Sequence, residues 1–562
     1  MAKIFYALNT NPLSKISFDI KCQKVKEYIS KEFAELPTHF LKEDNRFLAI
    51  VGYNEELKID LDKGCLGFVN NENWYKKETF PDGNYFIFRT NNNEMELLSD
   101  YCSTRTIWYY QKPSEYFCFS SFQLPIIIFK EDFKYNNKVT PWMISTGSLG
   151  PNNSWDKEIN LLPRLTSLKF SINEDKISLS SVEVVPPEKI PQKETDLIEF
   201  FDKYLKKGFD NIVIPVKSTA LLLSGGGESR LLLWYLGIKH KLQTITWTTP
   251  ESETVPGSDI QIAKALSAKF DLPHTIFHLK NENLPPKEIL DRFLKYGEGR
   301  IDHISGYLDG FELWKKIQQS GITSIIRGDH NFGRYKANNY ASSRRIARFQ
   351  FITDFENLSK YQIHQELEEQ IKPLPNESPM SFAYRLILNY TNPLIYSALN
   401  DFKLNFSEVN NPLLNNSMVA LSTVLPQYMM KNKRLTKKRN KINIPDIPIA
   451  TSVSIESLTN IAFIFKSEFQ ELFAQVTPDE LVIIDIPQDL FDDVNRYSKN
   501  VKENANTNNV KNLKKWIPKP IKKFLLSLKK DNISSSKLAF RMYILISMNK
   551  KINSILFEYN RP

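Results

Sequence analysis

Six residues near the middle of the chain combine the groups that hold phosphate. The run Ser224-Gly225-Gly226-Gly227-Glu228-Ser229 lies between two apolar stretches, residues 220–223 and residues 231–236. The first stretch predicts a buried strand and the second predicts the start of a helix, so the glycines fall on a strand-to-helix turn. On such a turn the first backbone N–H groups of the helix are unpaired and face an approaching anion.

The residue types in this run suit a nucleotide and its metal ion. Glycine lets the main chain approach phosphate closely, and Ser224 and Ser229 can donate hydroxyl groups. Glu228 can hold a magnesium ion that neutralises phosphate charge. We therefore predict that residues 224–229 bind the phosphates of a nucleotide, with a Gly-rich connection that binds nothing as the alternative.

The surrounding residues predict a parallel sheet that positions this loop. From about residue 195, predicted strands at residues 220–223, 242–248 and 274–279 alternate with helices such as residues 259–270. This alternation predicts a parallel sheet with helices on both faces, and ligands bind such sheets at the carboxyl ends of their strands. Beyond about residue 340 the pattern is mostly helical, and the Asn- and Lys-rich residues 495–512 predict a mobile loop.

The first part of the chain has a different residue pattern. Aromatic and β-branched residues alternate in residues 83–88 and 116–121, between turns rich in Asn, Asp and Gly, which predicts strands. Residues 184–191 contain three prolines and predict an extended linker. The predicted fold class is α/β, with a β-rich domain at residues 1–185, a parallel-sheet domain at residues 195–495 and a basic helical extension at residues 496–562.

Bulk composition indicates a cytoplasmic protein of several domains. The 562 residues exceed what a single core usually holds, and 41% of them are hydrophobic. The sequence has no apolar run near the ~20 residues that span a bilayer and no signal-peptide pattern, so no stable membrane insertion is expected. The four cysteines lack C-x-x-C spacing, which argues against a metal knuckle and predicts reduced thiols.

The net charge of +10 is concentrated in two segments. These are residues 431–441 and residues 511–530, and the second mixes lysines with Trp516, Phe524 and Leu525. A solvated basic face explains the second segment, and an amphipathic helix that meets an acidic partner, an anionic membrane surface or a peptide is the alternative. Because the excess is local, we do not expect nucleic-acid binding.

The loop resembles the pyrophosphate loop Ser-Gly-Gly-x-Asp-Ser of the ATP pyrophosphatases, with Glu228 at the usual Asp position. It is not a Walker loop, which needs Lys followed by Ser or Thr after the last glycine. Other segments resemble, in order, those of the asparagine synthase family, which includes the β-lactam synthetases and lasso-peptide cyclases. These segments are residues 100–110, 119–121, 147–149, 155–163, 324–335, 412–415 and 425–435. The resemblance spans most of the first 500 residues and implies an Ntn-hydrolase-like, glutaminase-like sandwich followed by an ATP-pyrophosphatase domain.

The same resemblance implies the ligands and part of the site. The cofactors would be ATP and Mg²⁺, with the adenine along Thr246-Trp247 and the phosphates in the loop. Gly328 and Asp329 lie in a second loop, where Asp329 falls at the position of a magnesium-binding Asp. With Glu228 it would supply the one or two carboxylates that a phosphate-bound magnesium ion requires.

Two further residues are candidates for catalysis. Lys433 resembles the family lysine that contacts the phosphates and the acyl-adenylate, with Lys431 and Lys437 as rivals in the same basic run. Glu298 falls where the family often has an acid before the substrate, and it could orient or deprotonate an amine; a surface acid is the alternative. His274 is expected to pack at the start of a strand.

The sequence also departs from the family pattern. Glutamine-hydrolysing members expose a nucleophilic cysteine after the initiator methionine, and Ala2 stands there, so glutaminase activity is not expected. Cys22 could replace it only if processing exposed it. The second loop differs at His330, Asn331 and Arg334, and Ile326 replaces a family Glu.

Three functions fit these observations. The favoured one is an ATP-dependent ligase that adenylates a small-molecule or peptide carboxylate, releases pyrophosphate and AMP, and joins the acyl group to an amine. It would act in peptide or secondary-metabolite biosynthesis, including macrolactam formation, and a partner protein could deliver the peptide. The alternatives are an ammonia-dependent amidotransferase on a sugar or amino-acid carboxylate, and a catalytically degenerate binding subunit.

Overall fold

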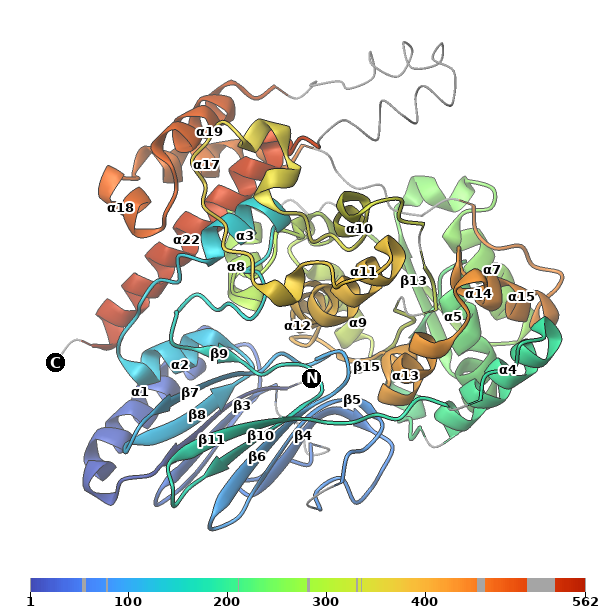
Figure 1. Cartoon of the computed structure of the whole chain (residues 1–562), viewed down its shortest axis with the longest axis horizontal. Helices are drawn as coiled ribbons and strands as arrows, with labels where there is room; N and C mark the ends of the chain where they lie inside the picture. Colours follow the sequence, from blue (N-terminus) through green and yellow to red (C-terminus); the bar gives the residue numbers. More distant parts are fainter. Residues whose placement is uncertain are drawn as a thin grey trace.

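The computed structural model describes residues 2–52, 57–76, 79–187, 189–210, 212–279, 284–329, 332–334, 336–451, 460–502 and 531–560 (Figure 1). The basic residues 511–530 and the two loop residues His330 and Asn331 lie outside these ranges.

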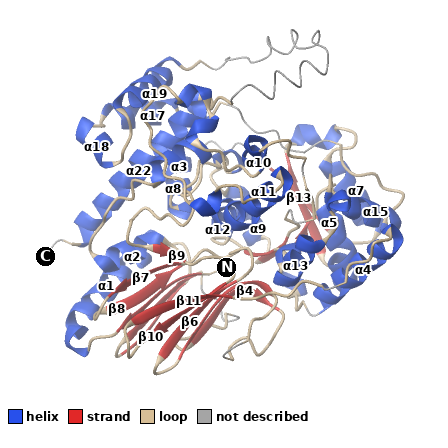
Figure 2. Cartoon of the chain, viewed as in Figure 1, coloured by secondary structure: helices blue, strands red, loops and turns tan. Residues whose placement is uncertain are grey.

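Two antiparallel sheets form the N-terminal part (Figure 2). The strand order in the first is β2 (Thr38–Glu43), β3 (Arg46–Val51), β1 (Lys3–Asn9), β8 (Tyr116–Ser120), β7 (Trp108–Lys112) and β9 (Asn160–Leu161). The strand order in the second is β11 (Lys176–Ser181), β10 (Thr166–Ser171), β6 (Glu94–Ser99), β5 (Gly83–Thr90) and β4 (Lys63–Val69).

Alternating side chains place these sheets face to face. On β1, Tyr6 packs with residues of the second sheet, and its ring centroid lies 5.5 Å from that of Phe88. The neighbouring Phe5 and Ala7 point the other way, into a core shared with α1 (Lys15–Glu32) and α2 (Gln123–Lys130). Because strand side chains alternate between faces, one strand serves both layers.

The later part of the chain contains a five-stranded parallel sheet. Its strand order is β14 (His274–His278), β13 (Gln243–Thr248), β12 (Thr219–Leu222), β15 (Ser324–Ile326) and β16 (Glu408–Asn410). The prediction of β-rich structure first, a parallel sheet later and helices around it is therefore confirmed. Strand β16 was missed, because three residues are too few to produce a strand pattern in a mostly helical region.

Helices cover both faces of the parallel sheet. Leu221, Leu223 and Ile326 share a core with α4 (Glu194–Asp210), α5 (Gly227–Leu232), α7 (Asp259–Lys269), α13 (Asn416–Val424), α14 (Gln427–Met430) and α15 (Arg434–Asn443). Ala220 and Ile325 face the opposite core, with α8 (Pro286–Gly297), α9 (Glu312–Gln319), α11 (Pro379–Leu386) and α12 (Ser397–Lys403). A π-helix, Ile387–Tyr396, joins α11 to α12.

The last helix of the chain packs against several other helices of the described structure. Helix α22 (Ser535–Tyr559) contacts α2, α3 (Val139–Thr146), α16 (Ile461–Ile464), α17 (Lys466–Ala474) and α19 (Gln488–Asn500). Two further helices in this half of the chain are α10 (Tyr340–Ile346) and α18 (Pro478–Ile483). The predicted mobile loop at residues 495–512 is wrong for residues 495–500, which form the last turns of α19, because apolar residues such as Val494 anchor that helix.

Within the described ranges, no helix is both long and apolar enough to cross a membrane. All four cysteines are free thiols, and three of them are buried.

Candidate functional site

The strand order creates a switch point beside β12. The chain passes from β12 outward through β13 and β14, and then returns to the opposite side of β12 to form β15. Connections that leave neighbouring strands in opposite directions open a crevice at the carboxyl edge of the sheet, where α/β proteins bind ligands. The segment 223–226 follows β12 and the segment 327–329 follows β15, so the two predicted loops flank this switch point.

The two loops touch at Gly328. A Cβ atom added at Gly328 would lie 2.9 Å from the Cβ of Glu228 and 3.0 Å from its carbonyl carbon. Only glycine allows this approach, and the residue that follows it is Asp329. Both carboxylate residues are buried, with 8% and 7% of their surfaces exposed respectively.

Hydrogen bonds within the first loop hold it as a turn. The Ser229 hydroxyl donates to the carbonyl of Ser224 at 2.8 Å, and the N–H of Gly226 donates to the Ser224 hydroxyl oxygen at 3.2 Å. Gly226 is the N-cap of α5, whose helical path continues through the π-helical residues Leu233–Gly237. The loop is therefore shaped before any anion arrives.

Gly225 is enclosed by the protein, whereas Gly226 is open. The N–H of Gly225 donates to Asp259 Oδ1 at 3.0 Å, and its carbonyl accepts from the N–H of Ala450 at 3.1 Å. Asp259, in the first turn of α7, was not predicted as a site residue, although an acid after Ser258 is a recognisable helix start. Burial raises the pKa of Asp259.

Two alanine substitutions should distinguish the enclosed Gly225 from the open Gly226. In Gly225→Ala the new Cβ would lie 2.3 Å from the Cβ of Ala450, so we expect unfolding free energy to fall by about 1–3 kcal/mol. In Gly226→Ala the new Cβ meets only the Ser224 hydroxyl, at 3.2 Å, so stability should be retained. Binding of the predicted MgATP should weaken, because the methyl group would keep phosphate away from the main chain. Urea unfolding and calorimetric titration measure both quantities. Equal destabilisation of the two variants would contradict this assignment.

The structure distinguishes Lys433 from its two rivals. Its Nζ lies 2.5 Å from Glu228 Oε1, whereas Lys431 and Lys437 are exposed. Lys433 has a left-handed backbone, with φ of 59°, and precedes α15. That helix also contacts the loop, because the Asn440 side-chain amide donates to the carbonyl of Gly227 at 2.8 Å.

The basic run around Lys433 is partly neutralised by α4. Arg434 and Lys438 pair with Glu194, and Arg439 pairs with Asp202. These ion pairs orient α15, so that much of the basic segment at residues 431–441 contributes to helix packing.

Asp329 has a cationic neighbourhood. Arg327 Nη2 lies 2.6 Å from Asp329 Oδ1, and the N–H of Arg327 donates to the carbonyl of Asn410 on β16 at 3.0 Å. Lys403, at the end of α12, faces the same region, and its Nζ lies 5.8 Å from the ring centroid of Trp314. Burial lowers the pKa of Lys403 well below its ordinary value, and the positive charge of Arg327 adds to this effect.

Lys403 should therefore make stability depend on pH. The unfolded chain binds a proton at Lys403 below pH about 10.5. The folded chain releases that proton at a lower pH, so stability should rise with pH between the two pKa values. Lys403→Met should raise the free energy of unfolding by at least about 1 kcal/mol at pH 7 and reduce this slope. Urea unfolding at pH 7 and pH 9 measures both effects, and destabilisation of the variant at pH 7 would contradict the prediction.

The side chains of Thr246 and Trp247, the predicted adenine contacts, pack within the protein. The Thr246 hydroxyl donates to the carbonyl of Leu223 at 2.6 Å, and the Trp247 ring packs edge-on against Trp314 with centroids 5.4 Å apart. His274 packs as expected, with its Nδ1 2.8 Å from the Thr244 hydroxyl.

Glu298 is placed at the junction between the two parts of the chain. Its carboxylate accepts the backbone N–H groups of Gln123 and Leu124 at 2.8 and 2.9 Å, at the start of α2. Trp155 Nε1 donates to its carbonyl at 2.7 Å, and burial raises its pKa. This arrangement favours a helix-capping role over the predicted activation of an amine.

The structure also places several residues at which the sequence differs from the family pattern. Ile326 is buried in β15, and the guanidinium carbon of Arg334 lies 3.1 Å from the ring centroid of Tyr384. Ala2 is buried before β1. Cys22 is buried against the first sheet, where burial raises its pKa, so this thiol is poorly suited to act as a nucleophile.

Comparisons with protein-family models and with curated proteins give no match for this chain. A functional proposal therefore depends on the geometry of the two loops and on the sequence motifs. Among the residues that the structure describes, no three His, Cys, Asp or Glu side chains gather as a metal cluster. Two carboxylates on the predicted phosphate loop and the loop beside it would suit a magnesium ion that completes its shell with phosphate oxygens and water.

Proposed function

We propose that this chain is an ATP-dependent amide ligase of the asparagine synthase type, which activates a carboxylate as its adenylate. The meeting of the two loops carries this proposal. Contact between Gly328 and Glu228 at the switch point gathers the predicted phosphate loop, two carboxylate residues and Lys433 from three separate segments of the sequence. An Ntn-hydrolase-like sandwich and an ATP-pyrophosphatase fold are the finer assignments that belong to the same proposal.

The residues present fit a magnesium nucleotide. Glu228 and Asp329 would hold the ion, and in the structure their charges are compensated by Lys433 and Arg327. Bound magnesium would neutralise phosphate charge during pyrophosphate departure. The extra methylene of Glu228, relative to the family Asp, suits its pairing with Lys433 across the loop.

The protein groups would act mainly by positioning and electrostatics. The backbone N–H groups at the start of α5 and the Ser224 hydroxyl would hold the phosphates. A carboxylate oxygen would attack the α-phosphorus, and the bond to the bridging oxygen of pyrophosphate would break. An amine would then attack the acyl carbon, lose a proton and release AMP. The ammonium of Lys433 lies where it can stabilise the charge that develops on the phosphates.

Calorimetric titration tests the proposal before any acyl substrate is known. MgATP should bind the wild-type protein, and binding should weaken at least about tenfold in Glu228→Ala and in Asp329→Ala. The control is Asp446→Ala, because Asp446 has an exposed side chain that pairs with Lys269. A wild-type protein that binds neither ATP nor MgATP would contradict the proposal and favour a degenerate binding subunit.

A second assay distinguishes the amine donor. Because Ala2 offers no nucleophile for glutamine hydrolysis, nitrogen would come from a substrate amine or from free ammonia. Pyrophosphate release that requires ammonium and a small acid would favour the ammonia-dependent reaction, whereas release with a peptide alone would favour intramolecular amide formation.

A further inference from the structure

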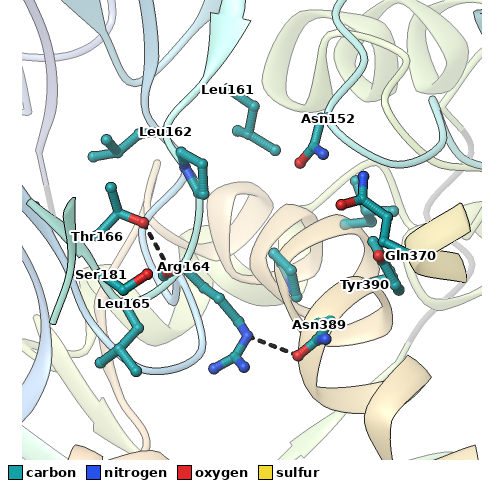
Figure 3. A pocket seen from close by; sticks show the side chains of 13 residues that line it. Asn152, Leu161, Leu162, Arg164, Leu165, Thr166, Ser181, Gln370, Asn389 and Tyr390 are labelled. Carbon is teal, nitrogen blue, oxygen red and sulfur yellow. Dashed lines mark hydrogen bonds between the residues drawn. The ribbon is translucent and has the colours of Figure 1, made fainter. Parts of the chain in front are cut away.

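Two pockets flank one hydrogen-bonded pair at the junction between the sandwich and the helical region. Figure 3 shows the first pocket and this pair. Their volumes are about 380 and 350 Å³. Arg164 and Asn389 line both pockets, and Arg164 Nε donates to Asn389 Oδ1 at 2.9 Å. Arg164 comes from the turn before β10 and Asn389 from the π-helix, so both parts of the chain build the site.

The walls of the two pockets suit a chain with apolar side chains and peptide groups. Leu161 and Leu394 contribute apolar surface to the first pocket, and Leu388 and Leu425 contribute it to the second. Neutral hydrogen-bonding side chains, among them Gln370, lie between the apolar ones. Each volume is close to the lower limit for ligand pockets, so a compact molecule would fill one pocket and a longer chain could use both.

Arg164 supplies a positive charge at the point that the pockets share. Its described acceptors are neutral: Asn389 Oδ1 and the carbonyl of Tyr101, which accepts from Nη1 at 3.1 Å. Its guanidinium carbon lies 4.9 Å from the centroid of the Tyr101 ring. The described lining residues include no acid, and the nearby Arg385 is already paired with Glu377 at 2.7 Å. A guanidinium is well matched to a carboxylate, which it binds through two parallel hydrogen bonds.

The second pocket adjoins the segments that carry the candidate site. Arg334 and Met430 both line it, and the N–H of Arg334 donates to the carbonyl of Met430 at 2.9 Å. Arg334 lies five residues after Asp329, and Met430 lies three residues before Lys433. A chain seated in this pocket would therefore lie beside the segment that continues the second loop and the segment that leads to Lys433.

We propose that the two pockets bind one acidic peptide segment. The segment places a Glu or Asp carboxylate on Arg164 and an apolar side chain in each pocket. The use of this peptide as a substrate rests on the proposed ligase function. Binding of the peptide needs neither ATP nor magnesium. A small carboxylate would use only the central cation, whereas the peptide uses the apolar walls on both sides.

Peptide binding without nucleotide tests this inference. The probe is a pool of acetylated tripeptide amides with central Glu and Leu, Val, Phe or Tyr at each flank, and a matched pool has central Gln. Saturation-transfer NMR should detect binding of peptides from the Glu pool. Titration of the protein with each peptide found in this way, and with its Gln equivalent, should show about tenfold weaker binding of the Gln peptide. No binding by any member of the Glu pool, or equal binding of the two pools, would overturn the proposal.

Two variants assign the effect to Arg164. Arg164→Met should weaken the selected Glu peptide about tenfold and leave the Gln peptide unchanged. Asn389→Asp should also weaken the Glu peptide, because the new carboxylate would pair with Arg164 in the folded protein. The control is Arg496→Met, at an exposed position of α19. MgATP binding is measured in parallel on the wild-type protein, so that absence of peptide binding alone overturns the peptide site and absence of MgATP binding alone overturns the nucleotide site.

Discussion

Lys433→Met is expected to weaken MgATP binding about 10- to 150-fold, the range for a hydrogen bond to a charged group of about 1.5–3 kcal/mol. The Lys433 ammonium lies 2.5 Å from Glu228, beside the phosphate loop. Replacement by methionine keeps the apolar stem and removes the charge that would face the phosphates. It also leaves the buried Glu228 carboxylate without this cation, which disfavours the folded loop around the nucleotide.

Lys437→Met is the matched control for this prediction. Lys437 lies one helical turn further along, on α15, and is exposed, so its removal should leave MgATP affinity unchanged. Thermal unfolding of both variants shows whether the fold is retained, and calorimetry gives the dissociation constants. Equal affinities for the two variants would remove Lys433 from the proposed site.

Asp302→Asn should lower the free energy of unfolding by about 3–5 kcal/mol, as expected when one partner of a buried ion pair is removed. Asp302 Oδ2 lies 2.7 Å from Arg541 Nε, and Arg541 Nη1 also donates to the carbonyl of Ile144 at 2.7 Å. This cluster attaches α22 to α3 and to the segment after α8. The asparagine variant would leave the Arg541 guanidinium buried without its carboxylate.

The ion pair between Asp302 and Arg541 should also make the free energy of unfolding depend on pH. Burial opposes ionisation of Asp302, but the positive charge of Arg541 and the contact with His303 together outweigh it and hold the pKa of Asp302 well below its ordinary value. The stabilisation is therefore complete above pH about 3.8, where the unfolded carboxyl is ionised, and is lost as pH falls below that value. Urea unfolding from pH 7 to pH 3 measures the effect. Asp44→Asn, which changes an exposed pair with Lys15, should behave as wild type.

Local sequence patterns were sufficient for the elements around the phosphate loop. The predicted strands at residues 220–223, 242–248 and 274–279 correspond to β12, β13 and β14, and the predicted helix at residues 259–270 corresponds to α7. Each element is a continuous segment whose apolar pattern or turn residues are visible within a short window. Such windows also indicated the β-rich character of the N-terminal part, whereas its antiparallel pairing is a finding of the structure.

Contacts between segments that are distant in sequence were harder to predict from local patterns. The choice of Lys433 over Lys431 and Lys437 depended on which side chain reaches Glu228, more than 200 residues earlier in the chain. The roles of Glu298 and Asp259 likewise depend on hydrogen bonds to residues far away in sequence. A basic or acidic side chain has the same local signature whether it caps a helix, pairs with a buried partner or faces solvent.

The sequence by itself determined the α/β class, the position of the glycine-rich turn and the kinds of chemical group available there, because propensity and periodicity act over a few residues. Only the tertiary structure decided which of those groups meet. The return of the chain to the far side of β12 sets the loop after β15 beside the first loop, and the missing side chain of Gly328 permits their contact. Packing over long sequence separations fixes that arrangement, and no short stretch of sequence records it.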